Sequence, residues 1–415
     1  MSLPGPTPSS SARGPRWASE RGAILVQTAI AFIGLTAFSA FVVDYGVLWS
    51  ARRQAQNSAD AAAMAAAVSL GFVDPDDQQR ARNAALDAAA QNRIWGAPPD
   101  ITGADITFPA CPVGSPGVGT NSCVRVDVFR NQRGGGNPLP TIFGNLVGVT
   151  NQGVRATATA QVMFGNSTNC VKPFAIPDKW TELNNNQGPP GWDATDSFER
   201  YRQNGGNRGQ VLNPADVYTP PTNNNNGTGF DVQLDYGLRL TVRPSPPNQA
   251  LQPGWYGSVI INPDCGPGAA CYEQAIAECA PNVIRAGDRL TMEPGRMVGP
   301  TRDGMAALIG RDPSATWSPS ANGGRGGVTG GCMSSGACAI SPRVVAIPVF
   351  NPDIWDYEQS QGRSTVVITR IVGMFLEQMQ GNNVIGRLMP YPSSPYSGTG
   401  GVPGSAFVIS IILVR

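Results

Sequence analysis

The sequence predicts an α+β protein. An N-terminal transmembrane helix continues into an αα-hairpin packed on a small antiparallel sheet, and a larger β-rich, disulfide-bonded domain follows. Residues 22–43 carry no charge and are mostly apolar, which is enough for a helix that crosses a bilayer. Residues 44–99 keep a helix-forming, alanine-rich composition, and from Ile101 the apolar residues alternate as in strands. Gly and Pro are abundant and charged residues make up 14% of the chain, which favours a loop-rich β architecture over a helical bundle.

The domain organisation follows from these changes of composition. A chain of 415 residues is long enough for two or three domains. The expected segments are a disordered cytoplasmic tail at 1–21, a transmembrane helix at 22–43, a helical stalk with a small β-sheet at 44–165 and a β-rich extracytoplasmic domain with long loops at 166–415.

Charge around the apolar run predicts its orientation. The tail is rich in Pro, Ser and Gly and carries three arginines against one glutamate. Beyond the run, two arginines are roughly balanced by two aspartates, namely Arg52 and Arg53 with Asp44 and Asp60. This modest positive-inside bias predicts a cytoplasmic N-terminus, with the bulk of the chain on the other side of the membrane.

Two other interpretations of the apolar run remain open. A cleaved signal peptide has a shorter apolar region of about 7–15 residues, whereas this run continues directly into further helix. A pilin-like leader would be cut after Gly22, but pilins carry a glutamate five residues into the mature chain, where this sequence has Gln27. A neutral amide forms hydrogen bonds between membrane helices but does not neutralise an amine, so an uncleaved anchor is favoured.

The residues directly after the run predict a membrane-exit site. Tyr45 and Trp49 lie four residues apart on one helix face, and amphipathic aromatic rings favour the headgroup region. The predicted membrane-exit residues are Asp44, Tyr45, Gly46 and Trp49.

An alanine-rich stretch, residues 61–67, continues the same helix. Such a smooth surface lets a second helix approach closely, but alanine is also the best helix former, so a docking surface and an ordinary helix explain the stretch equally well. The predicted partner-helix face contains Asn57, Asp60, Ala62 and Ala66.

A second helix is expected after the first. Asp74 can cap it, Pro75 suits its first position, and residues 96–99 end it. Its alanines share one face, so it should fold back on the first helix as an αα-hairpin.

Alternating apolar residues predict the strands. Residues 104–113, 123–130 and 154–164 should form the small antiparallel sheet. Residues 343–350 and 364–379 are strongly β in the second domain, and the apolar run at 406–415 is too short for a second membrane span.

The eight cysteines predict disulfides rather than a metal site. Structural zinc sites favour closely spaced cysteine pairs and histidine, but the spacings here are wider and the chain has no histidine. All eight lie after residue 110, on one side of the anchor, which fits an oxidising compartment. Cys111–Cys123 and Cys332–Cys338 are the expected local bridges. The other four pair among themselves in an order that the sequence leaves open: Cys170, Cys265, Cys271 and Cys279.

Residues 184–229 are rich in Asn, Gly and Pro and predict a long irregular insertion. Oxygen-rich loops of this kind can bind calcium, which is a minor alternative because no EF-hand loop is present. The two lysines of the chain, Lys172 and Lys179, are expected to be ordinary surface residues.

No motif for catalysis or cofactor binding is found. The chain lacks a G-x-S-x-G elbow and a G-x-x-x-x-G-K loop, and its glycine runs lack the strand–glycine–helix context of a dinucleotide site. A carboxylate pair for glycoside hydrolysis stays open, because its separation is three-dimensional. A net charge of +1 gives no electrostatic case for nucleic acid. We therefore expect no enzyme, cofactor or metal.

The membrane-exit segment also carries a longer pattern, V-D-x-G followed by a Gln-Asn and alanine run. Its residues are Val43, Asp44, Gly46, Gln56, Asn57, Ala59, Asp60, Ala61, Ala62, Ala63, Ala65, Ala66 and Ala67. The pattern resembles the TadE/TadG-like pilus-assembly family of the tight-adherence (Tad) secretion system, with Ser58 and Met64 as mild departures. The later CVRVDV, NPLPTIFGNLVGV and VRATATAQVMF extend the resemblance over about residues 20–165.

Longer members of that family add a von Willebrand A-like domain with an Asp-x-Ser-x-Ser metal site. Residues 193–197 read Asp-Ala-Thr-Asp-Ser, which is the wrong order, so the resemblance implies no such site here.

The resemblance implies a membrane-anchored structural or assembly component of a tight-adherence (Flp-type) pilus or a related secretion system. Its partners would be the lipid bilayer, through residues 22–43, and other proteins of that machine. It would cross the bacterial inner membrane once, with its bulk periplasmic or extracellular. The alternative is a cell-surface adhesin or ligand-binding module on the same anchor. The sequence leaves open which component it contacts and whether it enters the filament.

Overall fold

The computed structural model describes residues 20–111, 123–133, 136–183, 192–222, 225, 227–245, 250–361, 365–393 and 406–414. Residues 1–19 of the expected tail, and the asparagines at 184–186, 223, 224 and 226 of the expected insertion, lie outside this description. The chain divides into two compact units. One comprises Met1–Ser58, Ala90–Ile101 and Val128–Ala156, and the other comprises Ala59–Ala89, Thr102–Asp127 and Thr157–Arg415.

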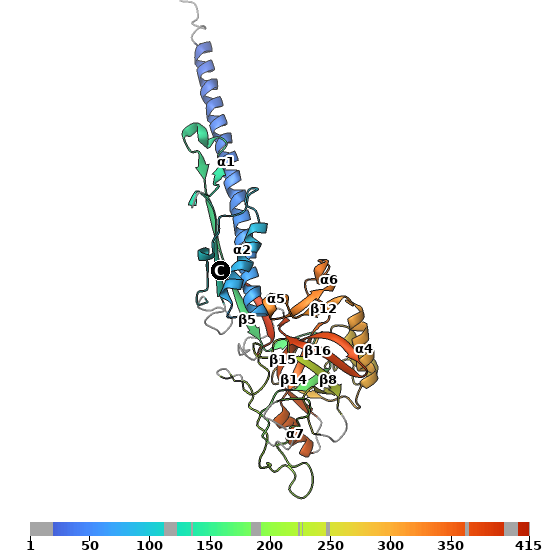
Figure 1. The fold of residues 1–415 in the computed structure, drawn as a ribbon. Helices are drawn as coiled ribbons and strands as arrows, with labels where there is room; N and C mark the ends of the chain where they lie inside the picture. The colour runs from blue at the N-terminus through green and yellow to red at the C-terminus, as the bar shows by residue number, and fades with distance from the viewer. Residues whose placement is uncertain are drawn as a thin grey trace, which may run out of the picture. The chain divides into compact units, whose positions relative to one another are not determined.

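The first element is one uninterrupted helix, α1, Glu20–Val68 (Figure 1). A short π-helical turn, η1, Ser69–Val73, follows it. Within this turn, a Cβ on Gly71 would lie 3.1 Å from Cγ2 of Ile409 and 3.2 Å from Cγ1 of Val162. The turn therefore packs closely on two strands described below. The prediction of a single helix that runs from the apolar segment into the alanine-rich segment is confirmed.

The second helix, α2, Gln78–Gln91, begins later than predicted. Its N-terminal cap is Asp77, whose Oδ1 accepts a hydrogen bond from Arg80 N at 2.8 Å. The prediction that Asp74 caps this helix is wrong. The Asp74 carboxylate instead accepts a bond from Asp76 N at 3.0 Å and pairs with Arg325 Nη1 at 3.2 Å, so it anchors the turn before the helix.

The predicted alanine face of α2 is buried. Ala81, Ala85 and Ala89 are fully covered, and their spacing of four places them on one side of the helix. After the helix, Trp95 N donates a hydrogen bond to Oε1 of Gln54 on α1 at 2.7 Å. The chain has therefore turned back along α1, as an αα-hairpin requires.

A five-stranded sheet has the strand order β1-β2-β5-β18-β17. Its strands are β1 Ile106–Thr107, β2 Cys123–Arg130, β5 Val154–Gly165, β17 Tyr391–Pro392 and β18 Val408–Val414. β18 runs antiparallel to β5, with Val408 opposite Gly165 and Val414 opposite Thr159. The small sheet expected from residues 101–164 is thus completed by a strand from the far end of the chain.

The larger sheet closes on itself. Its order is β11-β15-β14-β7-β9-β8-β16, and β16 also pairs with β15, so six strands form a ring and β11 lies at its edge. The strands are β7 Phe174–Pro177, β8 Arg239–Pro244, β9 Trp255–Ser258, β11 Arg289–Thr291, β14 Val344–Phe350, β15 Thr365–Gln380 and β16 Asn383–Met389.

Apolar side chains fill the inside of the ring. All six ring strands contribute to one buried cluster, which contains Phe174, Ile176, Leu240, Val242, Tyr256, Val345, Ile347, Val349, Val372, Met374, Leu376, Val384 and Leu388. A cluster shared by every strand of a closed ring lies within it, because successive side chains of a strand point to opposite faces.

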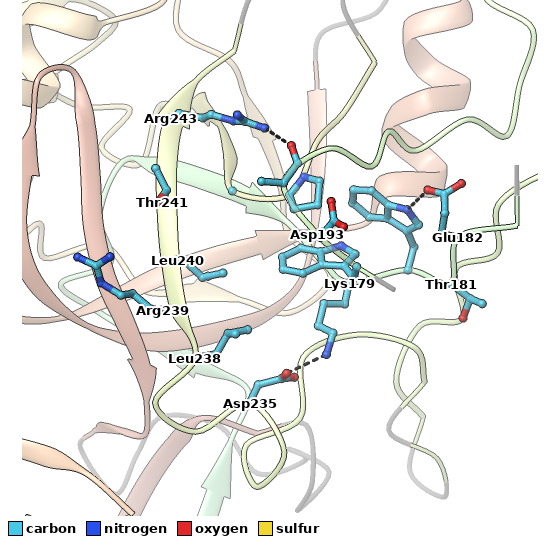
Figure 2. Close-up of a pocket in the computed structure, with 15 residues that line it drawn as sticks. Lys179, Thr181, Glu182, Asp193, Asp235, Leu238, Arg239, Leu240, Thr241 and Arg243 are labelled. Carbon is cyan, nitrogen blue, oxygen red and sulfur yellow. Dashed lines mark hydrogen bonds and ion pairs between the residues drawn. The ribbon is translucent and has the colours of Figure 1, made fainter. Parts of the chain in front are cut away.

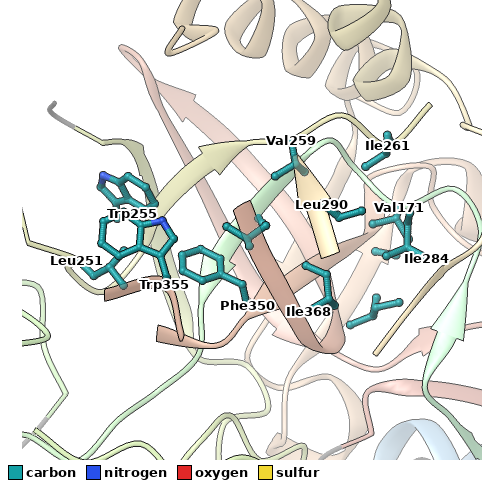
Figure 3. Close-up of a cluster of buried hydrophobic side chains, with 14 of the residues drawn as sticks. Val171, Leu251, Trp255, Val259, Ile261, Ile284, Leu290, Phe350, Trp355 and Ile368 are labelled. Carbon is teal, nitrogen blue, oxygen red and sulfur yellow. The ribbon is translucent and has the colours of Figure 1, made fainter. Parts of the chain in front are cut away.

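A second cluster covers the outer face (Figure 3). On β14, Ala346 and Phe350 belong to it, whereas their neighbours Val345 and Val349 belong to the inner cluster. Trp255, Phe350 and Trp355 pack together there, with the two indole centroids 5.4 Å apart. Both faces of β14 are thus buried, which explains its unbroken apolar sequence.

Shorter elements surround these sheets. The helices are α3 Ala269–Ala277, α4 Val298–Gly310, α5 Ala321–Gly324, α6 Gly331–Ser334 and α7 Pro352–Ser360, and the 3₁₀ turns are η2 Gly103–Asp105 and η4 Gly144–Val147. Three two-stranded ladders pair β3 Leu139–Pro140 with β4 Asn151–Gln152, β6 Ser167–Thr168 with β10 Ile284–Arg285, and β12 Ala315–Ser318 with β13 Gly327–Gly330.

A buried ion pair ties a long loop to the ring. Asp178, which is fully buried, lies 2.8 Å from Arg370 Nε. The same carboxylate accepts hydrogen bonds from Tyr218 Oη and Phe230 N, both at 2.9 Å. These bonds satisfy a charge that would otherwise be costly inside the protein.

The expectation that both lysines are ordinary surface residues is wrong. Lys172 is buried, and its Nζ donates to the carbonyl oxygens of Ile276 and Glu278, both at 2.6 Å, at the C-terminal end of α3. A cation is favoured at that end of a helix. Burial nevertheless lowers the pKa of Lys172 to about 8. Lys179 is partly buried and pairs with Asp235 Oδ1 at 2.8 Å.

All eight cysteines lie in the described residues and form four disulfides. The two predicted local bridges, Cys111–Cys123 and Cys332–Cys338, are confirmed. The structure also settles the pairing that the sequence left open, as Cys170–Cys279 and Cys265–Cys271.

Candidate membrane-exit site

The apolar half of α1 is exposed. Gly22–Val73 is the one helix of the described residues that is long and apolar enough to cross a membrane, and none of its most apolar stretch is buried within the chain. Leu25 is 72% exposed and Phe32 is 70% exposed. So much apolar surface on one helix requires a cover from outside the chain, which a bilayer provides.

Hydroxyl groups within this helix are satisfied locally. Thr28, Thr36 and Ser39 each donate to the carbonyl oxygen four residues earlier, at 2.8 to 2.9 Å. A hydroxyl paired in this way costs little in lipid. Their presence is therefore compatible with a membrane span.

Asp44 organises the point where the apolar stretch ends. Its carboxylate accepts hydrogen bonds from three consecutive backbone amides, namely Ile142 N at 2.8 Å, Phe143 N at 3.1 Å and Gly144 N at 2.6 Å. Gly144 begins the 3₁₀ turn η4, whose first amides have no partner within the turn. Asp44 thus caps this turn from a helix about a hundred residues earlier in the chain.

The loop that Asp44 binds is closed on itself. Thr141 Oγ1 donates to the carbonyl oxygen of Val149, and Val149 N donates to the carbonyl oxygen of Gly144 at 2.9 Å. The β3–β4 ladder joins the two ends of the loop. We call residues 141–149 the exit loop. Its amides converge on Asp44 because this local closure fixes them.

The hydrogen bonds set the charge state of Asp44. Partial burial raises the pKa of the carboxyl, the three amide bonds lower it, and the pKa ends below its ordinary value. Asp44 is therefore ionised at neutral pH.

Aromatic rings surround the exit. Tyr45 is 57% exposed and stacks on Phe41, with ring centroids 6.0 Å apart. Trp49 is 54% exposed, and the Arg53 guanidinium lies 4.9 Å from its ring centroid. Amphipathic rings beside a cation suit the polar headgroup region of a bilayer. A Cβ on Gly46 would meet no atom within 4 Å, so packing within the chain does not require a glycine there.

The four residues of the predicted partner-helix face differ in how exposed they are. Ala62 and Ala66 are fully buried within the chain, whereas Asn57 is exposed and Asp60 is partly buried. The two alanines are used for packing inside the molecule, so the prediction that they form an external docking face is corrected. Small side chains at this spacing let neighbouring elements of the same chain approach α1 closely.

The described residues show no group of three or more Asp, Glu or Cys side chains that could hold a metal ion.

Sequence reasoning found Asp44 but missed its partner. The exit loop lies nearly a hundred residues further along the chain, and nothing in its composition predicts that it binds a carboxylate. The one available signal is that NPLPTIFGNLVGV, which contains most of the loop, carried part of the family resemblance.

The comparison with protein families gives a match in the N-terminal segment. Residues 22–69 match the family model described as "Putative Flp pilus-assembly TadE/G-like", which agrees with the resemblance read from the sequence. The matched range contains Asp44, Tyr45, Gly46 and Trp49, and it ends one residue after α1. No curated protein and no solved structure matches the chain significantly.

Proposed function

We propose that this chain, whose residues 22–69 match the TadE/G-like family model, is a membrane-anchored structural component of a Flp-type pilus-assembly machine. The observation that carries the proposal is the exit site. The exposed apolar half of α1 ends at Asp44, which holds the exit loop through three amides and lies within the segment that matches the family.

The length of α1 suggests how the component works. At a rise of about 1.5 Å per residue, its 49 residues extend for roughly 70 Å, more than twice the thickness of the hydrocarbon core. One half is long enough to cross the lipid, and the other half continues beyond it. The chain then acts as a membrane mount that contacts other proteins of the pilus machine and performs no catalysis.

The proposed orientation is single-pass in the bacterial inner membrane, with the N-terminus in the cytoplasm. Four disulfides beyond the apolar segment favour an oxidising compartment for the folded part. The arginines of residues 1–21 support the same orientation.

A topology fusion tests this proposal. A reporter that is active only outside the cytoplasm is fused after Gly71, and a matched reporter is fused before Glu20. We expect activity from the first fusion and none from the second. The reverse pattern would overturn the orientation and the argument from disulfides.

Pilus formation tests the role. Deleting the gene should abolish Flp-type pili while the major pilin is still produced, and restoring the chain should restore the pili. Normal piliation of the deletion strain would contradict the proposal.

The second candidate function is a cell-surface adhesin or ligand-binding module, and a pocket in the larger unit favours it. Membrane-impermeant labelling of intact cells separates the two. Labelling that requires an opened outer membrane supports a periplasmic mount, whereas labelling of intact cells supports an adhesin.

A further inference from the structure

The pocket of the larger unit has a volume of about 670 Å³ and lies beside β8 (Figure 2). Its lining contains three acidic and three basic side chains, namely Glu182, Asp193, Asp235, Lys179, Arg239 and Arg243. Two of them, Lys179 and Asp235, already pair with each other at 2.8 Å. The charges of this pocket therefore favour no class of ligand, whereas the exit loop has a uniform chemistry.

The exit loop, residues 141–149, is uncharged and carries exposed apolar side chains. No charged residue lies between Arg133 and Arg155, and the loop occupies the middle of this run. On the loop itself, Ile142 is 55% exposed and Val149 is 51% exposed. Single exposed apolar side chains are ordinary on a protein surface, but two on one short uncharged loop form an apolar tip.

The backbone of the exit loop is largely satisfied without water. Its amides at three consecutive positions bind Asp44, as described above. Gly148 N donates to the carbonyl oxygen of Asn145 at 3.3 Å, and Val149 N is bonded within the loop as well. The Asn145 side chain donates to the carbonyl oxygen of Thr141 at 2.9 Å. A loop whose polar groups are bonded in this way can lie against lipid at low cost.

The place of the loop on α1 sets its level relative to the bilayer. Residues 22–39 are exposed throughout, and the first residue of the apolar run that the chain partly covers is Ala40, one helical turn before Asp44. Cover continues on the same helix face at Val47 and Ala51. The exit loop is bound at Asp44, and Figure 1 shows it as the green loop beside α1. It therefore lies at the end of the covered face that is nearest the apolar run.

We propose that the exit loop is a second membrane contact of the chain, in which Ile142 and Val149 lie in the interface between the lipid headgroups and the acyl chains. This contact depends on the proposed function, because it requires that α1 spans the bilayer. The loop continues the lipid-facing surface of α1, its run of sequence is uncharged, and its backbone needs little water. A bilayer is the natural occupant, because the span brings lipid to the loop without any further association.

Two contacts at different depths restrain α1. A single helix can tilt and rotate in a bilayer, but here such a movement would lift Ile142 and Val149 out of the interface. Asp44 transmits the restraint, because its hydrogen bonds fasten the loop to the helix. The helix is therefore held in one orientation relative to the membrane surface.

Depth-dependent quenching of a fluorescent label tests the contact. All eight cysteines are bridged, so one added cysteine takes the label in the full chain. Ile142→Cys and Val149→Cys report on the loop. Phe32→Cys and Asn57→Cys, both at exposed positions of α1, calibrate depth. Along the helix axis, Phe32 lies about 18 Å before Asp44 and Asn57 about 20 Å beyond it.

Each labelled chain is placed in nanodiscs at one copy per disc. The lipids carry a quencher either near the headgroup end or near the terminal end of the acyl chain, and iodide reports exposure to water. We expect each loop label to lie about 5–10 Å deep, so that the shallow quencher lowers its fluorescence at least about twofold more than the deep quencher or iodide does. The Phe32 label should respond to the deep quencher, and the Asn57 label to iodide alone.

The calibration sites separate the two ways in which the experiment can fail. Loop labels that respond to iodide as the Asn57 label does, beside a quenched Phe32 label, would exclude the loop contact and leave the anchor standing. Loop labels shielded from iodide and from both lipid quenchers would assign the loop to a protein surface, which also overturns the proposal. An unquenched Phe32 label would contradict the anchor and the loop contact together.

Circular dichroism and the melting temperature establish that each labelled chain is folded. The two loop positions are independent, so either one decides the question if the other variant does not fold.

Discussion

At the scale of single residues, Asp44 joins two parts of the exit site that are distant in the sequence. Its carboxylate receives three amide hydrogens from the exit loop. Bonds from amides to an ionised acceptor are stronger than bonds between neutral groups. The loop therefore depends on one negative charge next to the membrane.

Replacing Asp44 by asparagine tests this dependence. Asp44→Asn keeps the shape of the side chain, but it removes the charge and turns an NH₂ group toward the amide donors. We expect amide hydrogen exchange at Ile142, Phe143 and Gly144 to accelerate by about tenfold or more, and the number of pili to fall. Asp76→Asn, at an exposed aspartate, is the control and should change neither. Unchanged exchange in Asp44→Asn would show that the charge does not hold the loop.

Asp356 gives a prediction about pH. It lies on α7, and its carboxylate accepts hydrogen bonds from Tyr201 N at 2.8 Å and Gln203 Nε2 at 2.6 Å. Burial raises the pKa of Asp356 to about 7. The folded state therefore keeps a proton that the unfolded state loses near pH 4. The stability from this proton is complete below pH 4 and is lost as the pH rises towards 7.

The unfolding free energy of the unchanged chain should fall by at most about 1.4 kcal/mol per pH unit in that window because of this group. Asp356→Asn cannot titrate, so its unfolding free energy should lack this component. We subtract the unfolding free energy of Asp356→Asn from that of the unchanged chain, both measured by denaturant unfolding. This difference should decrease as the pH rises from 4 to 8. A difference that does not vary with pH would contradict the raised pKa.

The sequence identified Asp44 because a carboxylate directly after an apolar run marks the end of a span. It could not identify the amides that bind Asp44, nor the carbonyls that bind Lys172, because both sets of partners are about a hundred residues away. Local pattern shows the type of a residue and its place on an element. The partner depends on how distant segments meet.

At the scale of elements, the turn after α1 is a tight packing point. Gly71→Val would place two methyl groups where Ile409 and Val162 already lie within 3.2 Å of a Cβ. We expect a loss of about 1–3 kcal/mol in unfolding free energy, because the surrounding side chains must move.

Gly299→Ala in α4 is the control for that change. A Cβ on Gly299 would meet no atom within 4 Å, so the variant should be neutral or slightly more stable. Equal stability of Gly71→Val and the unchanged chain, measured by thermal unfolding, would show that the turn does not pack as described.

The sequence predicts some helices and strands well, but it does not predict how the strands pair. The helices of the hairpin and the main strands follow from periodicity, which is a local property. The sequence does not locate the start of α2, because Asp74 and Asp77 are both suitable caps and only the fold selects between them. The pairing of β5 with β18 and the closure of the ring are long-range, so no local pattern contains them.

At the scale of the whole molecule, the disulfides differ in how much chain they enclose. Cys170–Cys279 spans 109 residues, whereas Cys332–Cys338 spans 6. In the chain-entropy model the first restricts the unfolded state by about 4–5 kcal/mol and the second by about 2 kcal/mol. The double variant Cys170→Ser/Cys279→Ser should therefore melt at a lower temperature than Cys332→Ser/Cys338→Ser. The opposite order would show that strain or local packing outweighs this entropy.

The pairing of β18 with β5 has a consequence for biogenesis. Gly165 leaves the ribosome long before Val408, its neighbour across the sheet. If the folded part is exported as proposed, β5 reaches the far side of the membrane with one edge unpaired, and an unpaired strand edge invites association with other chains. The sheet is completed once the last strand has crossed. The newly exported protein then has an interval in which a periplasmic chaperone, or a second copy of the chain, competes with its own β18 for that edge.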